Sequence, residues 1–208
     1  MVRWKPGSRG RLHEAALELY ATRGFENTTV AEIAKRAGLT ERTFFRHFGD
    51  KREVLFAAAG ALQEALVSAV ANAPDSLAPI DAVAAGLEAA AAELPDRETA
   101  RARQRIIAAN PELRERELSK FAALSAALAE ALRGRGQPDP AATLTAEVGI
   151  AVFKVAFERW IDDTSDRDFP ERIRQSLKEL ETLRRDRRSP SASAQPPASS
   201  GVASANAP

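Results

Sequence analysis

The fold is decided by the stretch TVAEIAKRAGLTERTFFRHF, residues 29–48. Thr29 and Glu32 have the spacing of a capping box, which predicts the start of a short helix. Gly38 is expected to end that helix, because glycine accepts the left-handed conformation of a tight turn. Thr40 can then cap a second helix of about two turns. Two short helices joined by a glycine turn match a helix-turn-helix motif.

The second short helix divides its residues between two faces. Phe44 and Phe48 are four positions apart and are predicted to pack together into a small core. Arg42, Thr43 and Arg46 then point outward, with Glu41, Phe45 and His47 on the flanks. A helix that enters the major groove of DNA needs this division, since long donors reach base edges and neighbouring residues contact phosphates. A small helical domain with a solvated charged face has the same pattern, so the pattern alone leaves both open.

The rest of the chain also has helical periodicity, with apolar residues recurring every three to four positions. Proline and glycine separate the segments. We expect an all-α protein of about nine helices, over residues 8–23, 29–37, 40–48, 50–72, 79–93, 96–109, 111–133, 140–162 and 169–187. Residues 1–55 would form an N-terminal three-helix domain and residues 56–187 a helical C-terminal domain. The Ser-, Ala- and Pro-rich residues 188–208 are expected to be a disordered tail.

Composition restricts the chemistry. The chain has no cysteine, so it can hold no disulfide or cysteine-ligated metal. Its two histidines, His13 and His47, lie on different predicted helices, and no Gly-rich phosphate loop or activated nucleophile is present. We therefore predict no catalytic residues, no metal site and no cofactor. The protein is not expected to be an enzyme.

Charge and hydropathy indicate where the protein works and what it binds. Residues 1–55 carry eleven Lys or Arg against seven Asp or Glu, whereas the rest of the chain carries a small acidic excess. A basic N-terminal module suggests an anionic partner for that part only. No uncharged apolar run approaches the roughly 20 residues that a membrane span needs, and the basic N-terminus lacks a following apolar segment. We expect a soluble cytoplasmic protein that does not bind membranes.

A longer pattern is more specific. Residues 24–40, then 43–48 and Lys51, resemble the DNA-binding domain of TetR-family transcriptional regulators, and the resemblance runs over about residues 10–56 without a gap. It implies a homodimer of nine or ten helices in which the first three bind DNA. The C-terminal domain would then hold the ligand pocket and the dimer interface. The implied function is a ligand-responsive regulator, a repressor released from a palindromic operator on double-stranded DNA by a small molecule.

The resemblance also assigns the DNA contacts. Thr29 matches a cap that contacts phosphate, and His47 and Lys51 match further phosphate contacts. The positions that match the base-contacting face are Glu41, Arg42, Thr43 and Arg46. Phe45 stands where the family usually has a tyrosine whose hydroxyl contacts phosphate, so this chain would make only an apolar contact there.

The C-terminal half resembles the family mainly in its helical plan. Residues 106–114 are similar to a subgroup of mycofactocin regulators whose ligand is an acyl-CoA, which implies an apolar or acyl-CoA-like effector. The family's pocket position suggests Phe121, Phe153, Phe157 and Trp160 as pocket residues, with Arg103 and Arg105 meeting an acidic ligand. The alternative for each of these aromatic residues is plain core or the dimer interface, and the arginines could equally be solvated. The expected dimer interface comprises Val148, Val152, Ile173, Leu177 and Leu180.

Three alternatives stay open from sequence. A helical interaction protein would bind no duplex DNA, and its affinity for DNA would show no salt dependence. A small helical enzyme would need a catalytic constellation that the sequence lacks. A regulator of this type could also activate transcription instead of repressing it.

Overall fold

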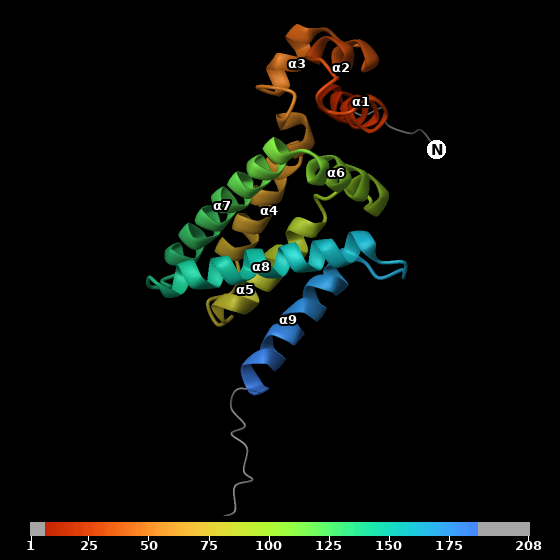
Figure 1. Ribbon diagram of the computed structural model, residues 1–208. Helices are drawn as coiled ribbons and strands as arrows, with labels where there is room; N and C mark the ends of the chain where they lie inside the picture. Colours follow the sequence, from red (N-terminus) through yellow and green to blue (C-terminus); the bar gives the residue numbers. More distant parts are fainter. Residues whose placement is uncertain (1–6, 187–208) are drawn as a thin grey trace, which may run out of the picture.

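The computed structural model describes residues 7–186, and these residues form helices without any strand. The elements in order are α1 (Ser8–Arg23), α2 (Val30–Arg36), α3 (Glu41–His47), the 3-10 turn η1 (Glu53–Phe56), α4 (Ala59–Ala71), α5 (Pro79–Ala91), α6 (Arg97–Ala109), α7 (Pro111–Gly134), α8 (Ala141–Asp162) and α9 (Phe169–Asp186). Figure 1 shows α1–α3 gathered at one end and α4, α5, α7, α8 and α9 packed into a bundle at the other. The predicted all-α fold of about nine helices is confirmed. The predicted tail, residues 188–208, lies outside the described residues.

The helix-turn-helix forms as its capping residues predict. The Thr29 hydroxyl accepts a hydrogen bond from the Glu32 amide at 3.2 Å, and the Glu32 carboxylate accepts one from the Thr29 amide at 2.9 Å. The Thr40 hydroxyl accepts from the Thr43 amide and so caps α3. Gly38 has a φ of +66°, a conformation that other residues adopt at a cost. These local interactions fix the angle at which α3 leaves α2.

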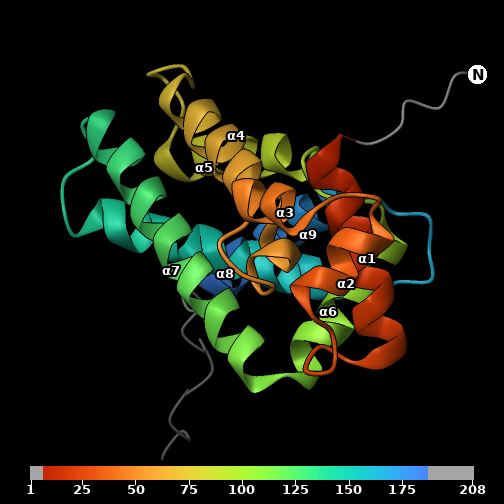
Figure 2. The same cartoon turned by 90° about the horizontal axis from the view of Figure 1, so that it is seen from above.

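The N-terminal core is built from more of the chain than its first three helices. Phe44 of α3 is fully buried, and residues of α1, α2 and η1 pack in the same core. Ile106 and Ile107 of α6 and Leu113 of α7 complete the same core. Figure 2, which looks down on the N-terminal helices, shows α1 lying over α6. The N-terminal end therefore rests on two helices that are 50 or more residues distant in sequence.

The C-terminal core joins α4, α5, α7, α8 and α9. Its helices approach closely at Gly149 of α8, where a Cβ atom would lie 2.5 Å from Cγ1 of Val83. No side chain larger than hydrogen fits there without movement of the neighbouring helix. The close approach explains why a glycine stands in the middle of α8.

The segment from Asp50 to Ala58 differs from the single helix over residues 50–72 that the sequence predicts. Asp50 accepts hydrogen bonds from the amides of Arg52 and Glu53, a 3-10 turn follows, and α4 begins only at Ala59. Side chains occupy carbonyl oxygens that a continuous α-helix would use for its own amides. Those carbonyls and their donors are Val54 with His13, Leu55 with Arg103, and Ala57 with Arg9.

The stretch Glu53–Ala71 is long and apolar enough to cross a membrane by length and composition alone. Leu62, Leu66 and Val70 on this stretch are buried in the C-terminal core. A core helix of a soluble protein passes the same test of length and composition, so this one stretch is weak evidence for a membrane span.

Candidate functional site

The outer face of α3 presents two free cations. Arg42 and Arg46 are exposed, and neither makes a hydrogen bond or ion pair with any residue in the range 7–186. Phe44 and Phe48, on the opposite face, are buried and hold the helix to its core. A guanidinium group with all its donors unused can bind guanine bidentately or pair with phosphate. Glu41 and the half-buried Thr43 flank this face, as the sequence predicts.

Phe45 is the exposed aromatic residue of this surface. Its side chain is 55% exposed, and the edge of its ring contacts Phe44 with centroids 5.4 Å apart. One side of the Phe45 ring is therefore packed against Phe44, and the other side is open to solvent. It can offer an apolar contact to a thymine methyl or a sugar, but it has no hydroxyl with which to bind phosphate.

Thr29 and His47 are less available than their matched roles suggest. The exposed Thr29 hydroxyl is already bonded to Glu32, and these bonds from the backbone and side chain of Thr29 lower the pKa of Glu32. His47 is half-buried, and its Nε2 atom is enclosed without a hydrogen-bond partner among the described residues. The structure thus does not present the His47 Nε2 atom to solvent as a phosphate contact would require.

Lys51 has a different set of partners from the one predicted. Its ammonium group donates to the carbonyl oxygens of Phe25, Glu26 and Thr28 at 2.9, 3.2 and 3.2 Å, and it lies 4.4 Å from the centroid of the Phe25 ring. An ammonium group has three donors, so all of them are used. The loop between α1 and α2 leaves these carbonyls without helical partners, and the long lysine side chain reaches back to satisfy them. In this arrangement Lys51 stabilises the loop, and its phosphate contact stays a prediction that would require these bonds to be given up.

Replacing Lys51 with methionine should therefore lower the free energy of unfolding by about 1–3 kcal/mol, because three carbonyls lose a charged donor. The measurement is chemical denaturation followed by circular dichroism. Lys35→Met is the control, since Lys35 is exposed on α2 and its loss should change stability by less than about 0.5 kcal/mol. If Lys51→Met leaves stability unchanged but reduces the salt dependence of DNA binding by about one unit, the phosphate role is correct after all.

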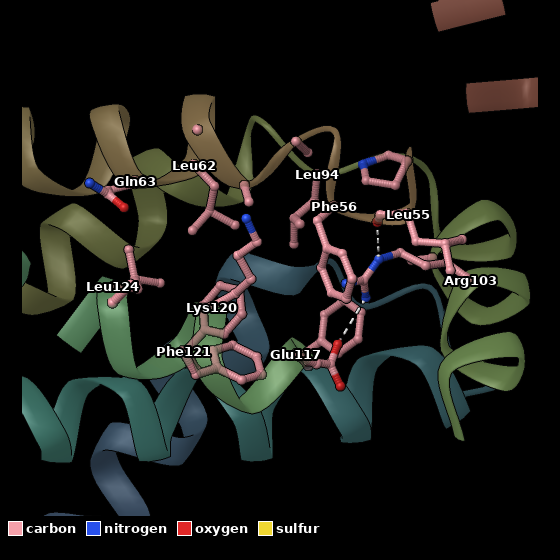
Figure 3. Close-up of a pocket in the computed structure, with 18 of the residues that line it drawn as sticks. Leu55, Phe56, Leu62, Gln63, Leu94, Arg103, Glu117, Lys120, Phe121 and Leu124 are labelled. Carbon is pink, nitrogen blue, oxygen red and sulfur yellow. Dashed lines mark hydrogen bonds and ion pairs between the residues drawn. The ribbon is translucent and has the colours of Figure 1, made fainter. Parts of the chain in front are cut away.

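A cavity of about 300 Å³ lies where the N-terminal helices meet the bundle. Its walls come from α1, η1, α4, α6, α7 and α8, and Figure 3 shows their side chains around the space. Most of the wall is apolar and aromatic. Cavities of this size and composition are typical of sites for small organic ligands.

The polar wall of the cavity is bonded to the segment from Asp50 to Ala58, which connects α3 to α4 and is called the linker below. Arg103 donates from Nε to the Leu55 carbonyl at 2.7 Å and from one terminal nitrogen to the Glu117 carboxylate at 3.1 Å (Figure 3). Burial lowers the pKa of the Arg103 guanidinium, while Glu117 opposes that change. His13 donates from Nδ1 to the Val54 carbonyl at 2.8 Å, and burial lowers the pKa of this histidine. The side chains of α1 and α6 thus hold η1 against the cavity.

Of the residues that the sequence suggests for ligand binding, Phe121, Phe153, Phe157 and Arg103 lie in the cavity wall. Trp160 does not line it, because its ring packs on Phe169 with centroids 5.3 Å apart. Arg105 is exposed and also lies outside the wall. The predicted arginine that does line the wall is Arg103, which sits about 200° away around α6.

Sequence reasoning missed Glu117, Lys120 and His13 as cavity residues. One signal was available, because Arg103 falls between Ala100 and Ile107 on the buried face of α6. A charged residue on a buried stripe needs a buried partner, and that partner is Glu117. The position of Lys120 and His13 depends on how α7 and α1 pack and has no local signal.

The predicted dimer residues are mostly used inside the chain. Val152 and Ile173 are 5% and 0% exposed and belong to the C-terminal core, so they cannot face a partner. Leu177 and Leu180 are half-buried against the same core, and Val148 is half-buried. The apolar residues that α8 exposes are Leu144, Ala151 and Val155. Together with Val148 they recur at intervals of four, three and four residues, which places them on one face.

Comparison with family models gives two matches along the chain. Residues 12–58 match the model described as bacterial regulatory proteins, tetR family. Residues 77–185, more than half of the chain, match the model described as the MftR C-terminal domain. The first match covers the helix-turn-helix surface, and the second covers most of the bundle.

Two curated relatives illustrate these matches. The regulator TcmR of Streptomyces glaucescens is 36% identical over 91 residues, which are 44% of this chain and 40% of TcmR. The putative mycofactocin biosynthesis transcriptional regulator MftR of Mycobacterium tuberculosis is 28% identical over 161 residues, 74% of this chain and 80% of MftR. The alignment thus spans less than half of TcmR but most of MftR. Both relatives are described as transcriptional regulators.

Solved structures share the fold. SmeT, the repressor of a multidrug efflux pump of Stenotrophomonas maltophilia, aligns with a TM-score of 0.57 at 20% identity, over 85% of this chain and 90% of SmeT. A transcriptional regulator from Pseudomonas aeruginosa PAO1 aligns with a TM-score of 0.59 at 21% identity, over 87% of this chain and 92% of its own. At these identities the likeness concerns the arrangement of helices.

Proposed function

Because this chain belongs to the TetR family of DNA-binding transcriptional regulators, we propose that it is a ligand-responsive repressor that binds a palindromic operator as a homodimer. A small molecule in the cavity would release it from DNA. The observation that carries this proposal is the outer face of α3, where Arg42 and Arg46 lie free above a buried phenylalanine pair. In a dimer, the two copies of α3 would enter successive major grooves roughly 34 Å apart.

The proposal is tested by recovering DNA. The purified protein is mixed with sheared genomic fragments, and the retained fragments are sequenced to give the operator. With that operator, Arg46→Ala should weaken binding by about 1–3 kcal/mol if Arg46 contacts a base. Fluorescence anisotropy at fixed salt measures the loss, since affinity depends steeply on salt concentration.

Arg159→Ala is the matched control for Arg46→Ala. It removes the same charge from α8, where Arg159 pairs with Glu179 far from α3. Its affinity for the operator should remain that of the unchanged protein. Equal losses in both variants would mean that net charge alone drives binding, and no retained fragment at all would contradict a DNA-binding function.

Regulators of this family act as dimers, and α8 offers a face for the contact. Leu144, Val148, Ala151 and Val155 form an exposed or half-exposed apolar stripe along this helix, and we refer to it as the α8 stripe. A second copy of the chain would cover it by isologous packing, so that each stripe meets its own equivalent. This assignment replaces Val152 and Ile173, which the core already uses.

The cavity would hold the effector. The match of the bundle to the MftR C-terminal domain supports the expectation of an apolar or acyl-CoA-like molecule. Binding would act only through a different affinity for the two arrangements of the α3 helices, so a few kcal/mol of coupling would release the DNA. The relatives named above are regulators and not enzymes, and we assign no catalytic role to the cavity. Regulators of this family are generally cytoplasmic, and the same location is proposed here.

A further inference from the structure

The cavity touches the segment that connects the two halves of the chain. Leu55 and Phe56 of η1 form part of its wall, and η1 lies between α3 and α4 (Figure 3). Across the space lie Phe121 of α7 with Phe153 and Phe157 of α8. A molecule in the cavity would therefore contact the linker and the bundle at the same time.

The charged groups of the wall are not equally available. Arg103 and Glu117 bond to each other, and Arg103 also bonds to the linker, so their charges offset each other within the protein. Gln104 donates a further hydrogen bond to the Glu117 carboxylate. Burial lowers the pKa of His13, and the remaining charged group of the wall is Lys120, whose side chain extends from α7 toward Leu62 in Figure 3.

Lys120 is paired with a carboxylate that is shared with a second cation. Its ammonium group lies 2.9 Å from one oxygen of Glu53, and Nε of Arg116 lies 2.6 Å from the other. Burial opposes ionisation of Glu53, but the bonds from Lys120 and Arg116 outweigh it and hold the pKa of this carboxyl below its usual value. Glu53 would keep the partner Arg116 if Lys120 turned away. Lys120 thus has a partner that it can exchange.

The ion pairs at Glu53 also join the two halves of the protein. Glu53 is the first residue of η1, while Arg116 and Lys120 are on α7. Glu53 does not line the cavity, whereas Lys120 does. A negative group inside the cavity would compete with Glu53 for the same ammonium group and weaken one link between α7 and the linker.

We propose that the cavity binds a small apolar monoanion whose charged group pairs with Lys120 in exchange for Glu53, while its apolar body packs on the phenylalanines. The exchange loosens the contact between α7 and η1 and shifts the protein toward the state that releases DNA. This inference rests on the proposed function, because it names the class of effector and the contact through which the effector acts. The apolar wall selects the body of the ligand, and Lys120 selects its charge.

The class of ligand is tested with three probes of one chain length. Decanoate, decanol and decylamine are titrated calorimetrically into the full chain at neutral pH, below the concentration at which they form micelles. Decanoate should bind about tenfold more tightly than decanol, because it adds a charge-assisted bond, and decylamine should bind most weakly. Equal binding of decanoate and decanol, or a preference for decylamine through Glu117, overturns the proposal. So does an absence of binding by all three, when octanoate and dodecanoate also fail to bind.

Variants distinguish an exchange of Lys120 from Glu53 to the ligand from a simple attraction between Lys120 and the ligand. Lys120→Met should lose the preference for decanoate over decanol. Arg114→Met is the control, because it removes an exposed cation of the same helix that lies outside the cavity wall and makes no bond to Glu53 among the described residues, and it should keep the preference. Glu53→Gln should bind decanoate more tightly than the unchanged protein, since the competing carboxylate is gone. Unchanged affinity in Glu53→Gln would overturn the exchange.

The DNA-binding function and the ligand proposal fail in different experiments. Ligand titrations use the protein without DNA, and recovery of genomic fragments uses the protein without ligand. Lys120-dependent decanoate binding by a chain that retains no DNA would support the ligand class and contradict the DNA-binding function. Retained DNA that decanoate does not release, in a chain that binds decanoate through Lys120, would overturn the regulatory part of the inference.

Discussion

A chain with aspartate in place of Val155 should be monomeric and should bind a two-half-site operator about 10²- to 10⁴-fold more weakly than the unchanged protein. Val155 is 42% exposed within the α8 stripe, so the substitution should leave the fold of the single chain intact. In a dimer it would place two carboxylates in an apolar contact, where burying unpaired charge is costly. Losing the partner removes the second α3 helix, and the gain from binding both half-sites at once is lost.

Light scattering and fluorescence anisotropy measure the two parts of this result. The Val155→Asp chain should scatter as a monomer and should bind one-half-site and two-half-site DNA almost equally. Leu118→Asp is the matched control, because Leu118 is an exposed apolar residue of α7, outside the α8 stripe, and this variant should remain a dimer. A monomeric Leu118→Asp chain beside a dimeric Val155→Asp chain would place the interface on α7.

Truncating Phe44 to alanine should lower the free energy of unfolding of the N-terminal half by about 3–5 kcal/mol. The ring is fully buried and packs against Phe45 and Phe48 with centroids 5.4 and 5.6 Å away. Its removal leaves a cavity under a helix of only seven residues, which has too few hydrogen bonds to stay folded without packing. Denaturation followed by circular dichroism measures the loss, and operator binding should fall with it.

The neighbouring residue provides the control for Phe44→Ala. Phe45→Ala removes an identical side chain that is more than half exposed, so its stability should change by about 0.5 kcal/mol or less. Its effect should appear in DNA binding, through the lost apolar contact. If Phe45→Ala were the more destabilising of the two, the assignment of the faces of α3 would be wrong.

The sequence was sufficient where the determining interactions are local. The capping box of Thr29 and Glu32, the cap at Thr40 and the turn at Gly38 all involve residues a few positions apart, and the structure confirms each of them. The outward direction of Arg42 and Arg46 follows from helical periodicity once Phe44 is assigned to the core. The helix-turn-helix and the exposed face of α3 could therefore be predicted from sequence, whereas the DNA contacts themselves stay a prediction.

A local pattern cannot predict a contact whose partner lies far away in sequence. Lys51 bonds to carbonyls more than 20 residues before it, and no local pattern distinguishes such a lysine from one that faces phosphate. The α8 helix is apolar on more than one face, and periodicity does not say which face packs on the same chain. Val152 was therefore assigned to the interface, whereas Val155, three residues later, is the exposed residue.

Residues of α6 and α7 complete the N-terminal core, and this limits how the DNA-binding segment of this chain can be transferred to another regulator. Ile106, Ile107 and Leu113 lie outside the segment that matches the DNA-binding family model, residues 12–58, yet they complete the core on which α1 to α3 rest. A hybrid regulator that takes only residues 12–58 from this chain would place the helices on a foreign α6, with apolar surface left unmatched at the junction. Transferring Ile106, Ile107 and Leu113 along with that segment would keep the complementary surface. The unit that can be exchanged is therefore set by which residues pack together, and these residues are not continuous in sequence.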